Sequence, residues 1–190
     1  MEQLTALRAT PNLHTWRPCD AVESAIAWKQ ALLREAGPTA LVFSRQTLPA
    51  QITGMDQARL APRGGYVLVP EQGSLDAIII ATGSEVALAV EAAARLTEEG
   101  KGIRVVSMPC AEVFEAQEAG YRETVLPSDV LARVAVEAGH TDFWYKYVGL
   151  DGRVVGMSSF GESAPADALF RHFGLTTDSV MAAVEDVILD

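Results

Sequence analysis

The sequence predicts an α/β fold: a doubly wound, mostly parallel sheet with helices on both faces, preceded by a partial α/β unit. Two observations support this prediction. Over residues 63–190, short apolar runs alternate with stretches of helical periodicity, the pattern of parallel strands joined by helices. Residues 1–48 show the same alternation, but two short strands and one long helix are too few to cover both faces of a parallel sheet.

The first unit is expected to begin with a short helical turn at residues 4–8. Residues 14–17 are a candidate strand, and residues 39–44 form a short apolar run that is typical of a buried strand. Because a unit of fewer than about 50 residues seldom folds alone, it is expected either to dock on the rest of the chain or to be the tail of a larger domain cut off upstream. The family resemblance given below favours the second interpretation.

Between these two strands, residues 20–35 are predicted to form a helix. Asp20 is a natural N-cap, and Glu23 completes a capping-box pattern. Gly37 followed by Pro38 ends the helix. Its expected buried stripe consists of apolar residues at helical spacing: Val22, Ala25, Ile26, Leu32 and Leu33.

Residues 49–62 are expected to be an inter-domain linker, because proline and glycine surround polar side chains there without sustained periodicity. Beyond it, the predicted strands are residues 65–69, at an edge of the sheet, then 76–81, 103–108, 133–137 and 154–157. The predicted helices are residues 85–99, a stretch near 112–117, one beginning around Pro165, and 175–189. The domain prediction is therefore 1–48, a linker at 49–62, and an α/β domain of four or five strands at 63–190.

Composition excludes several classes of function. Fifteen Lys and Arg against twenty-five Asp and Glu give a net charge of −10 without a basic run, which argues against nucleic acid and against an anionic membrane surface. The chain has no apolar stretch of roughly 18 residues and no signal-peptide features at its start. Two cysteines, Cys19 and Cys110, form no disulfide framework, so a cytoplasmic protein with reduced thiols is expected.

The turn Thr82-Gly83-Ser84-Glu85 lies between a strand and a helix, where α/β folds bind anions. It lacks both the G-x-G-x-x-G pattern and a Walker A loop. The favoured interpretation is a tight turn in which Thr82 or Ser84 caps the helix.

Other reactive residue types are scattered. The three histidines, His14, His140 and His172, show no metal-ligand spacing. Neither cysteine has the electropositive neighbours that favour a thiolate, apart from Arg17 near Cys19. From these residues alone, the chain shows no complete catalytic constellation.

Two features allow alternative interpretations. Four aromatic residues stand within residues 143–147, and such a cluster suits either an interface or intramolecular packing. Arg45 follows the strand at 39–44, and ligands bind at the carboxyl ends of parallel strands. A guanidinium there can hold a phosphate through two hydrogen bonds, although a strand-end arginine is more often a surface charge.

Eleven short strings stand in the same order and spacing as in bacterial transketolases. They are residues 10–12 (TPN), 16–20 (WRPCD), 37–41 (GPTAL), 44–46 (SRQ), 63–68 (RGGYVL), 80–85 (IATGSE), 104–109 (RVVSMP), 121–123 (YRE), 125–127 (VLP), 144–149 (WYKYVG) and 161–167 (GESAPAD). Essentially the whole chain thus resembles the last part of a transketolase. Residues 1–48 resemble the end of its pyrimidine-binding domain, and residues 63–190 resemble its C-terminal domain.

The resemblance implies an enzyme that transfers a two-carbon ketol unit from a ketose phosphate to an aldose phosphate. It implies thiamine diphosphate with Mg²⁺ or Ca²⁺ as cofactors, a homodimer, and catalytic, cofactor and metal residues that all lie upstream of Met1. One functional position carries over: Arg45, in Ser44-Arg45-Gln46, matches the arginine that contacts the substrate phosphate. On this basis the chain alone is expected to be inactive, with the remainder of the enzyme as its partner.

Two alternatives stay open. A deoxyxylulose-phosphate synthase or the β subunit of a 2-oxo-acid dehydrogenase shares the fold, although residues 16–20 and 161–167 favour transketolase. A regulatory or dimerisation module of the same origin, without catalytic activity, is the other alternative.

Overall fold

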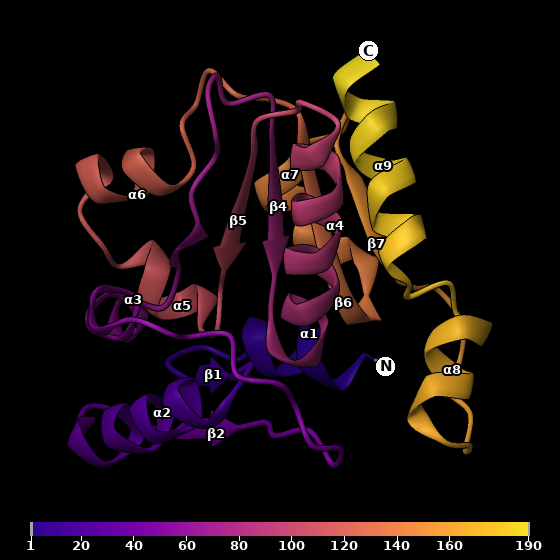
Figure 1. Cartoon of the computed structure of the whole chain (residues 1–190). Helices are drawn as coiled ribbons and strands as arrows, with labels where there is room; N and C mark the ends of the chain where they lie inside the picture. The colour runs from indigo at the N-terminus through magenta and orange to yellow at the C-terminus, as the bar shows by residue number, and fades with distance from the viewer. Residues whose placement is uncertain (1, 190) are drawn as a thin grey trace.

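The computed structural model describes residues 2–189 and contains a five-stranded sheet in the order β3-β5-β4-β6-β7 (Figure 1). The strands are β3 (Tyr66–Val69), β4 (Ala77–Ala81), β5 (Ile103–Ser107), β6 (Arg133–His140) and β7 (Arg153–Met157). Strand β3 is antiparallel to β5, and the remaining neighbours are parallel. The predicted fold class and the edge position of the first of these strands are confirmed.

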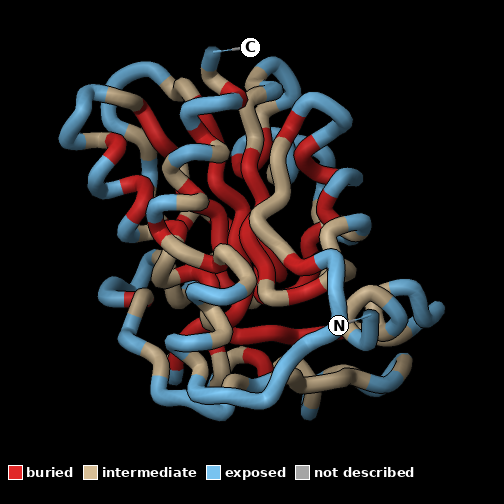
Figure 2. The backbone as a smooth tube through the Cα atoms, turned by 90° about the vertical axis from the view of Figure 1, so that its right-hand side faces the viewer, coloured by how far each residue is buried: buried red, intermediate tan, exposed pale blue. Residues whose placement is uncertain are grey.

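Helices cover both faces of this sheet. Helices α4 (Val86–Glu98) and α9 (Thr177–Leu189) pack on the face that carries Ile79, Val105 and Val134. Helices α5 (Ala111–Glu115), α6 (Ala119–Val125) and α7 (Tyr145–Val148) lie over the face that carries Ile78, Ile80 and Val106. Successive side chains of a strand point to opposite faces, so the central strand β4 is buried along its whole length, as Figure 2 shows for the middle of the molecule.

Short helices stand where periodicity predicted none. Helix α3 (Met55–Leu60) and a 3₁₀ turn (Ala61–Arg63) lie within the expected linker, and α6 and α7 were not predicted. Each spans two turns or fewer, which is too short for a helical period to be recognised. Helix α3 is fixed locally, because the Gly54 N–H donates to Oε1 of Gln57 over 2.9 Å. Helix α8 (Ala166–His172) begins directly after Pro165.

The first unit consists of α1 (Gln3–Ala9), β1 (His14–Trp16), α2 (Ala21–Leu33) and β2 (Thr39–Leu41), with β1 and β2 paired in parallel. The capping of α2 is confirmed, since Oδ1 of Asp20 accepts from the Glu23 N–H over 2.9 Å. The predicted stripe of α2 is wrong at three of its five positions: Ala25 is exposed, and so are Leu32 (78%) and Leu33 (65%). A two-stranded sheet is too narrow to cover the whole helix, and only Val22 and Ile26 of the stripe reach the main core.

The first unit lies at the carboxyl ends of the parallel strands of the large sheet, toward which the arrowheads of β4 and β5 point in Figure 1. The backbone of Arg17 joins the two parts: its N–H donates to the Pro109 carbonyl over 2.7 Å, and its carbonyl accepts from the Gly83 N–H over 3.0 Å. Four charged side chains meet at this junction: Arg8, Arg17, Glu85 and Glu137. The crevice in which open α/β sheets bind ligands is therefore filled by the chain's own first unit.

A chain that lacks residues 1–61 should still fold, at reduced stability. Most of both large core clusters lies between the sheet and helices α4–α7 and α9, all within residues 62–190. Thermal unfolding followed by circular dichroism should show a single cooperative transition at a lower Tm than that of the whole chain.

Removal of residues 177–190 is the control for this truncation. It takes away α9, whose Val180 and Val184 are fully buried, and should abolish the cooperative transition. A non-cooperative chain 62–190 would show that the α/β domain depends on the first unit.

Candidate functional site

Arg45 lies in the loop that follows β2. The Val42 N–H donates to the Trp16 carbonyl over 2.8 Å, which extends the β1–β2 pairing, and Oγ of Ser44 donates to the Gln46 carbonyl over 3.0 Å. The loop therefore turns just as the strand ends. Within residues 2–189 the Arg45 guanidinium has no hydrogen-bond or ion-pair partner, so its donors are free to bind an anion.

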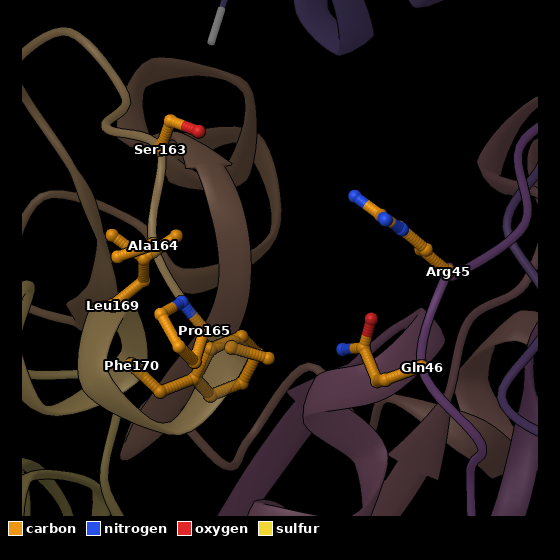
Figure 3. Close-up of a pocket in the computed structure, with 8 residues that line it drawn as sticks. Arg45, Gln46, Ser163, Ala164, Pro165, Leu169 and Phe170 are labelled. Carbon is orange, nitrogen blue, oxygen red and sulfur yellow. The ribbon is translucent and has the colours of Figure 1, made fainter.

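A cleft with a volume of about 690 Å³ opens beside Arg45. Arg45 and Gln46 form one wall, and the opposite wall comes from Ser163, Ala164, Pro165, Ala166, Leu169 and Phe170. Figure 3 shows the guanidinium extending into the space between the walls, with the Ser163 side chain on the far side. Of the residues that line the cleft, Arg45 alone is charged, which gives it the character of a site for one anionic group.

The opposite wall of this cleft was not predicted from the residues. The string 161–167 carried part of the family resemblance but no role. Only the pairing of β7 in the sheet brings the segment after it within reach of Arg45.

The turn Thr82-Gly83-Ser84-Glu85 is closed to an external anion. Arg17 fills the space beside Gly83, which has φ of +59°, and its guanidinium donates to the Thr82 carbonyl over 2.8 Å. The same guanidinium forms a buried ion pair with Glu85. The expected side-chain cap is absent at Thr82, whose Oγ1 donates to the Arg17 carbonyl over 3.1 Å instead, while Oγ of Ser84 bonds to Glu85.

The histidines and cysteines do not come together. Among residues 2–189, no group of three or more His, Cys, Asp or Glu side chains could hold a metal ion. Cys19 and Cys110 are buried, and burial raises the pKa of both thiols, so neither is disposed to ionise. These residues by themselves do not fit a metal-dependent diphosphate site, and no cofactor step can be derived from them.

The aromatic cluster at 143–147 is mainly internal. Trp144 is fully buried, Tyr147 is 7% exposed, and both belong to the core under α7. The cluster also contacts the first unit, because the Arg8 guanidinium lies 4.5 Å from the centre of the Phe143 ring and 5.3 Å from that of Trp144. It therefore combines intramolecular packing with the junction between the two parts of the chain.

Most of the chain matches two models of known protein families. Residues 64–176, more than half of the chain, match the family model described as "Transketolase-like TK C-terminal domain", and residues 1–51 match "Transketolase, pyrimidine binding domain". The chain belongs to the transketolase family.

Individual relatives agree with this assignment. "Transketolase 1" of Vibrio vulnificus strain YJ016 is 57% identical over 188 residues, which cover 99% of this chain and 28% of that relative. The structure of a transketolase from Leishmania mexicana is 42% identical with a TM-score of 0.89, over 99% of this chain and 27% of that one. A Pichia stipitis transketolase in complex with sedoheptulose-7-phosphate is 37% identical with a TM-score of 0.88, over 100% of this chain and 27% of that one. The chain thus spans little more than a quarter of the length of these relatives.

Proposed function

We propose that this chain is the C-terminal portion of a transketolase, the enzyme that moves a two-carbon ketol unit between a ketose phosphate and an aldose phosphate. The proposal is supported by 57% identity over nearly the whole chain. One structural observation extends the proposal to a single residue: the Arg45 guanidinium, which has no hydrogen-bond or ion-pair partner among residues 2–189, projects into a cleft at the end of a parallel strand. We assign Arg45 to the phosphate of the sugar substrate.

The remaining roles belong to this proposal. Residues 1–48 are the tail of the pyrimidine-binding domain, residues 49–62 the linker, and residues 63–190 the C-terminal domain. Thiamine diphosphate and Mg²⁺ or Ca²⁺ are held by the rest of the enzyme, which supplies the catalytic groups and forms a homodimer. None of the helices described within residues 2–189 is long and apolar enough to cross a bilayer. We place the enzyme in the cytoplasm, where its substrates would be sugar phosphates.

A second candidate is a separate subunit that is inactive without its partner. One structural relative is described as "Split gene transketolase, inactive beta4 tetramer"; it is 27% identical with a TM-score of 0.76, and this chain covers 62% of it. Both candidates require further domains for catalysis, and they differ in whether those domains are covalently joined.

The test is a chimeric enzyme in which residues 1–190 replace the matching 28% of the Vibrio vulnificus relative. We expect ketol transfer between sugar phosphates, since the chain brings the anion-binding arginine and a C-terminal domain of the same fold. The chain alone should show no activity and no micromolar binding of thiamine diphosphate with Mg²⁺ by titration calorimetry. An inactive but folded chimera would count against the proposal, and cofactor binding by the chain alone would contradict the assignment of the cofactor site.

A further inference from the structure

The two walls of the cleft belong to different parts of the chain. Arg45 and Gln46 follow β2 of the first unit, whereas the wall from Ser163 to Phe170 follows β7 of the large sheet (Figure 3). The distance between the guanidinium and the opposite wall therefore depends on how the first unit is seated on the large sheet. A contact that fixes the position of the first unit relative to the large sheet therefore also fixes the width of the cleft.

Glu137 is the residue of the large sheet to which two arginines of the first unit bind. It lies in β6, its side chain is 1% exposed, and both of its oxygens bind the first unit. Nη1 of Arg8 donates to Oε2 over 2.6 Å and Nη2 to Oε1 over 2.7 Å, so the pair is bidentate. Nη1 of Arg17 lies 3.6 Å from Oε1, and the indole N–H of Trp144 donates to Oε2 over 2.8 Å.

Arg8 and Arg17 favour the ionised form of Glu137 more strongly than burial disfavours it. Burial opposes ionisation of Glu137, but the hydrogen bonds and charge of Arg8, the charge of Arg17 and the Trp144 indole hold its pKa below the ordinary value. A buried carboxylate held by a bidentate guanidinium and an indole donor has one well-defined geometry, unlike a surface ion pair.

Backbone pairing connects Glu137 to both walls. On one side, Arg17 directly follows β1, whose Trp16 is paired with Leu41 of β2, and the chain then runs on to Arg45. On the other side, β6 is paired with β7, with Val136 opposite Val155, and the chain leaving β7 forms the second wall. The Glu137 side chain thus connects the strand pair that leads to one wall with the strand pair that leads to the other.

We propose that Glu137 is a positioning residue for the phosphate-binding cleft: through Arg8 and Arg17 it holds Arg45 at the distance from the Ser163–Phe170 wall that a substrate phosphate requires. This inference rests on the proposed role of Arg45. It adds that the C-terminal domain, which carries Glu137, controls the affinity of the enzyme for phosphorylated substrates without contacting them through Glu137.

The test is Glu137→Gln in the chimeric enzyme, because glutamine keeps the shape of the side chain but cannot accept at both positions. We expect KM for a phosphorylated acceptor to rise about three- to tenfold, with kcat and the KM for an unphosphorylated acceptor little changed. Arg8→Lys keeps the charge but loses the fork, so it should give a smaller rise of the same kind; it also serves if Glu137→Gln fails to fold. The control is Glu71→Gln, which breaks the partly buried pair with Arg104 (2.6 Å), outside the cleft lining, and should leave both KM values unchanged.

A double-mutant cycle with Arg45→Ala decides between positioning and general destabilisation. If Glu137 acts through Arg45, adding Glu137→Gln to Arg45→Ala should raise KM less than about twofold further. Equal rises for both kinds of acceptor, or a full additional rise in the Arg45→Ala background, would overturn the inference. If Arg45→Ala itself leaves the KM for phosphorylated acceptors unchanged, the proposed role of Arg45 is wrong, and the two failures are thereby distinguished.

Discussion

Replacing Arg45 by alanine in the chimeric enzyme should raise KM for phosphorylated substrates roughly ten- to a hundredfold. Hydrogen bonds between charged groups contribute about 1.5–3 kcal/mol each, and about 1.4 kcal/mol corresponds to a factor of ten. The effect should fall on KM, because a phosphate far from the bond being broken is bound equally well in the ground and transition states. Steady-state kinetics with phosphorylated and unphosphorylated acceptors is the measurement.

Two further variants make this prediction specific. Arg45→Lys should recover only part of the affinity, since an ammonium group cannot reproduce the two parallel hydrogen bonds of a guanidinium. Arg59→Ala removes another exposed arginine, which forms a surface ion pair with Asp56 three positions earlier in the same helix, and should leave KM unchanged. Equal losses for both kinds of acceptor in Arg45→Ala would mean that Arg45 supports the loop and does not bind phosphate.

The overall charge makes a local cation important for such a substrate. The chain carries a net charge of −10, so an anionic sugar phosphate approaches an unfavourable average field. Arg45, with no carboxylate paired to it among residues 2–189, offsets that field at one place. Raising the ionic strength should therefore weaken phosphate capture by the wild type more than by Arg45→Ala.

The central strands could be predicted because their burial leaves an apolar run in the sequence; strand β2 (Thr39–Leu41), expected to be buried, is only partly buried along its length. Strand β4 is buried on both faces and appears as the uninterrupted run Ala77–Ala81. Short helices carry a weaker signal: α3, α6 and α7 were not predicted, although α1, α5 and α8, which are as short, were. The stripe of α2 was misjudged for another reason: apolar spacing identifies a face that can be buried, but not whether anything covers it, and Leu32 remains 78% exposed.

The candidate site likewise has one part that local sequence indicates and another part that depends on the tertiary fold. Arg45 could be proposed as a site residue from its place after a strand and from the resemblance of its neighbours, both of which are local in sequence. The opposite wall of the cleft and the role of Glu137 depend on tertiary pairing, since Arg8 and Glu137 stand 129 positions apart. Glu137 is the one acidic residue in the strands described within residues 2–189, so its position in an apolar strand is a local signal, but only the fold shows that Arg8 and Arg17 meet it.

The junction also depends on Glu23, and its replacement by alanine should destabilise the chain strongly. Glu23 is completely buried, and three groups donate to it: the Tyr66 hydroxyl over 2.8 Å, the Ser107 hydroxyl over 2.6 Å and the Cys19 N–H over 2.7 Å. Glu23→Ala leaves all three donors unpaired, each at a cost of about 1–3 kcal/mol, so the free energy of unfolding should fall by at least about 3 kcal/mol. Urea denaturation of the whole chain measures this.

An exposed glutamate provides the matched control. Glu98, in the last turn of α4, should change the free energy of unfolding by no more than about 0.5 kcal/mol when replaced by alanine. A loss for Glu23→Ala as small as that for Glu98→Ala would mean that the three donors find other partners and that Glu23 does not hold the junction.

The pH dependence of Glu23→Gln tests the electrostatics of the same position. Burial raises the pKa of Glu23, and the hydrogen bonds from Ser107, Cys19 and Tyr66 oppose this shift without reversing it. A carboxyl whose pKa is higher in the folded than in the unfolded state, where it is about 4.5, contributes stability below that pH and loses it as the pH rises through the folded pKa. Glutamine does not titrate, so the stability advantage of wild type over Glu23→Gln should be largest in acid and shrink as the pH rises above about 4.5. Urea denaturation of wild type and Glu23→Gln across this pH range should show that their free energies of unfolding converge as the pH rises. A wild-type advantage that grows with pH would contradict this prediction, because it would mean that the three donors stabilise the carboxylate more than burial destabilises it.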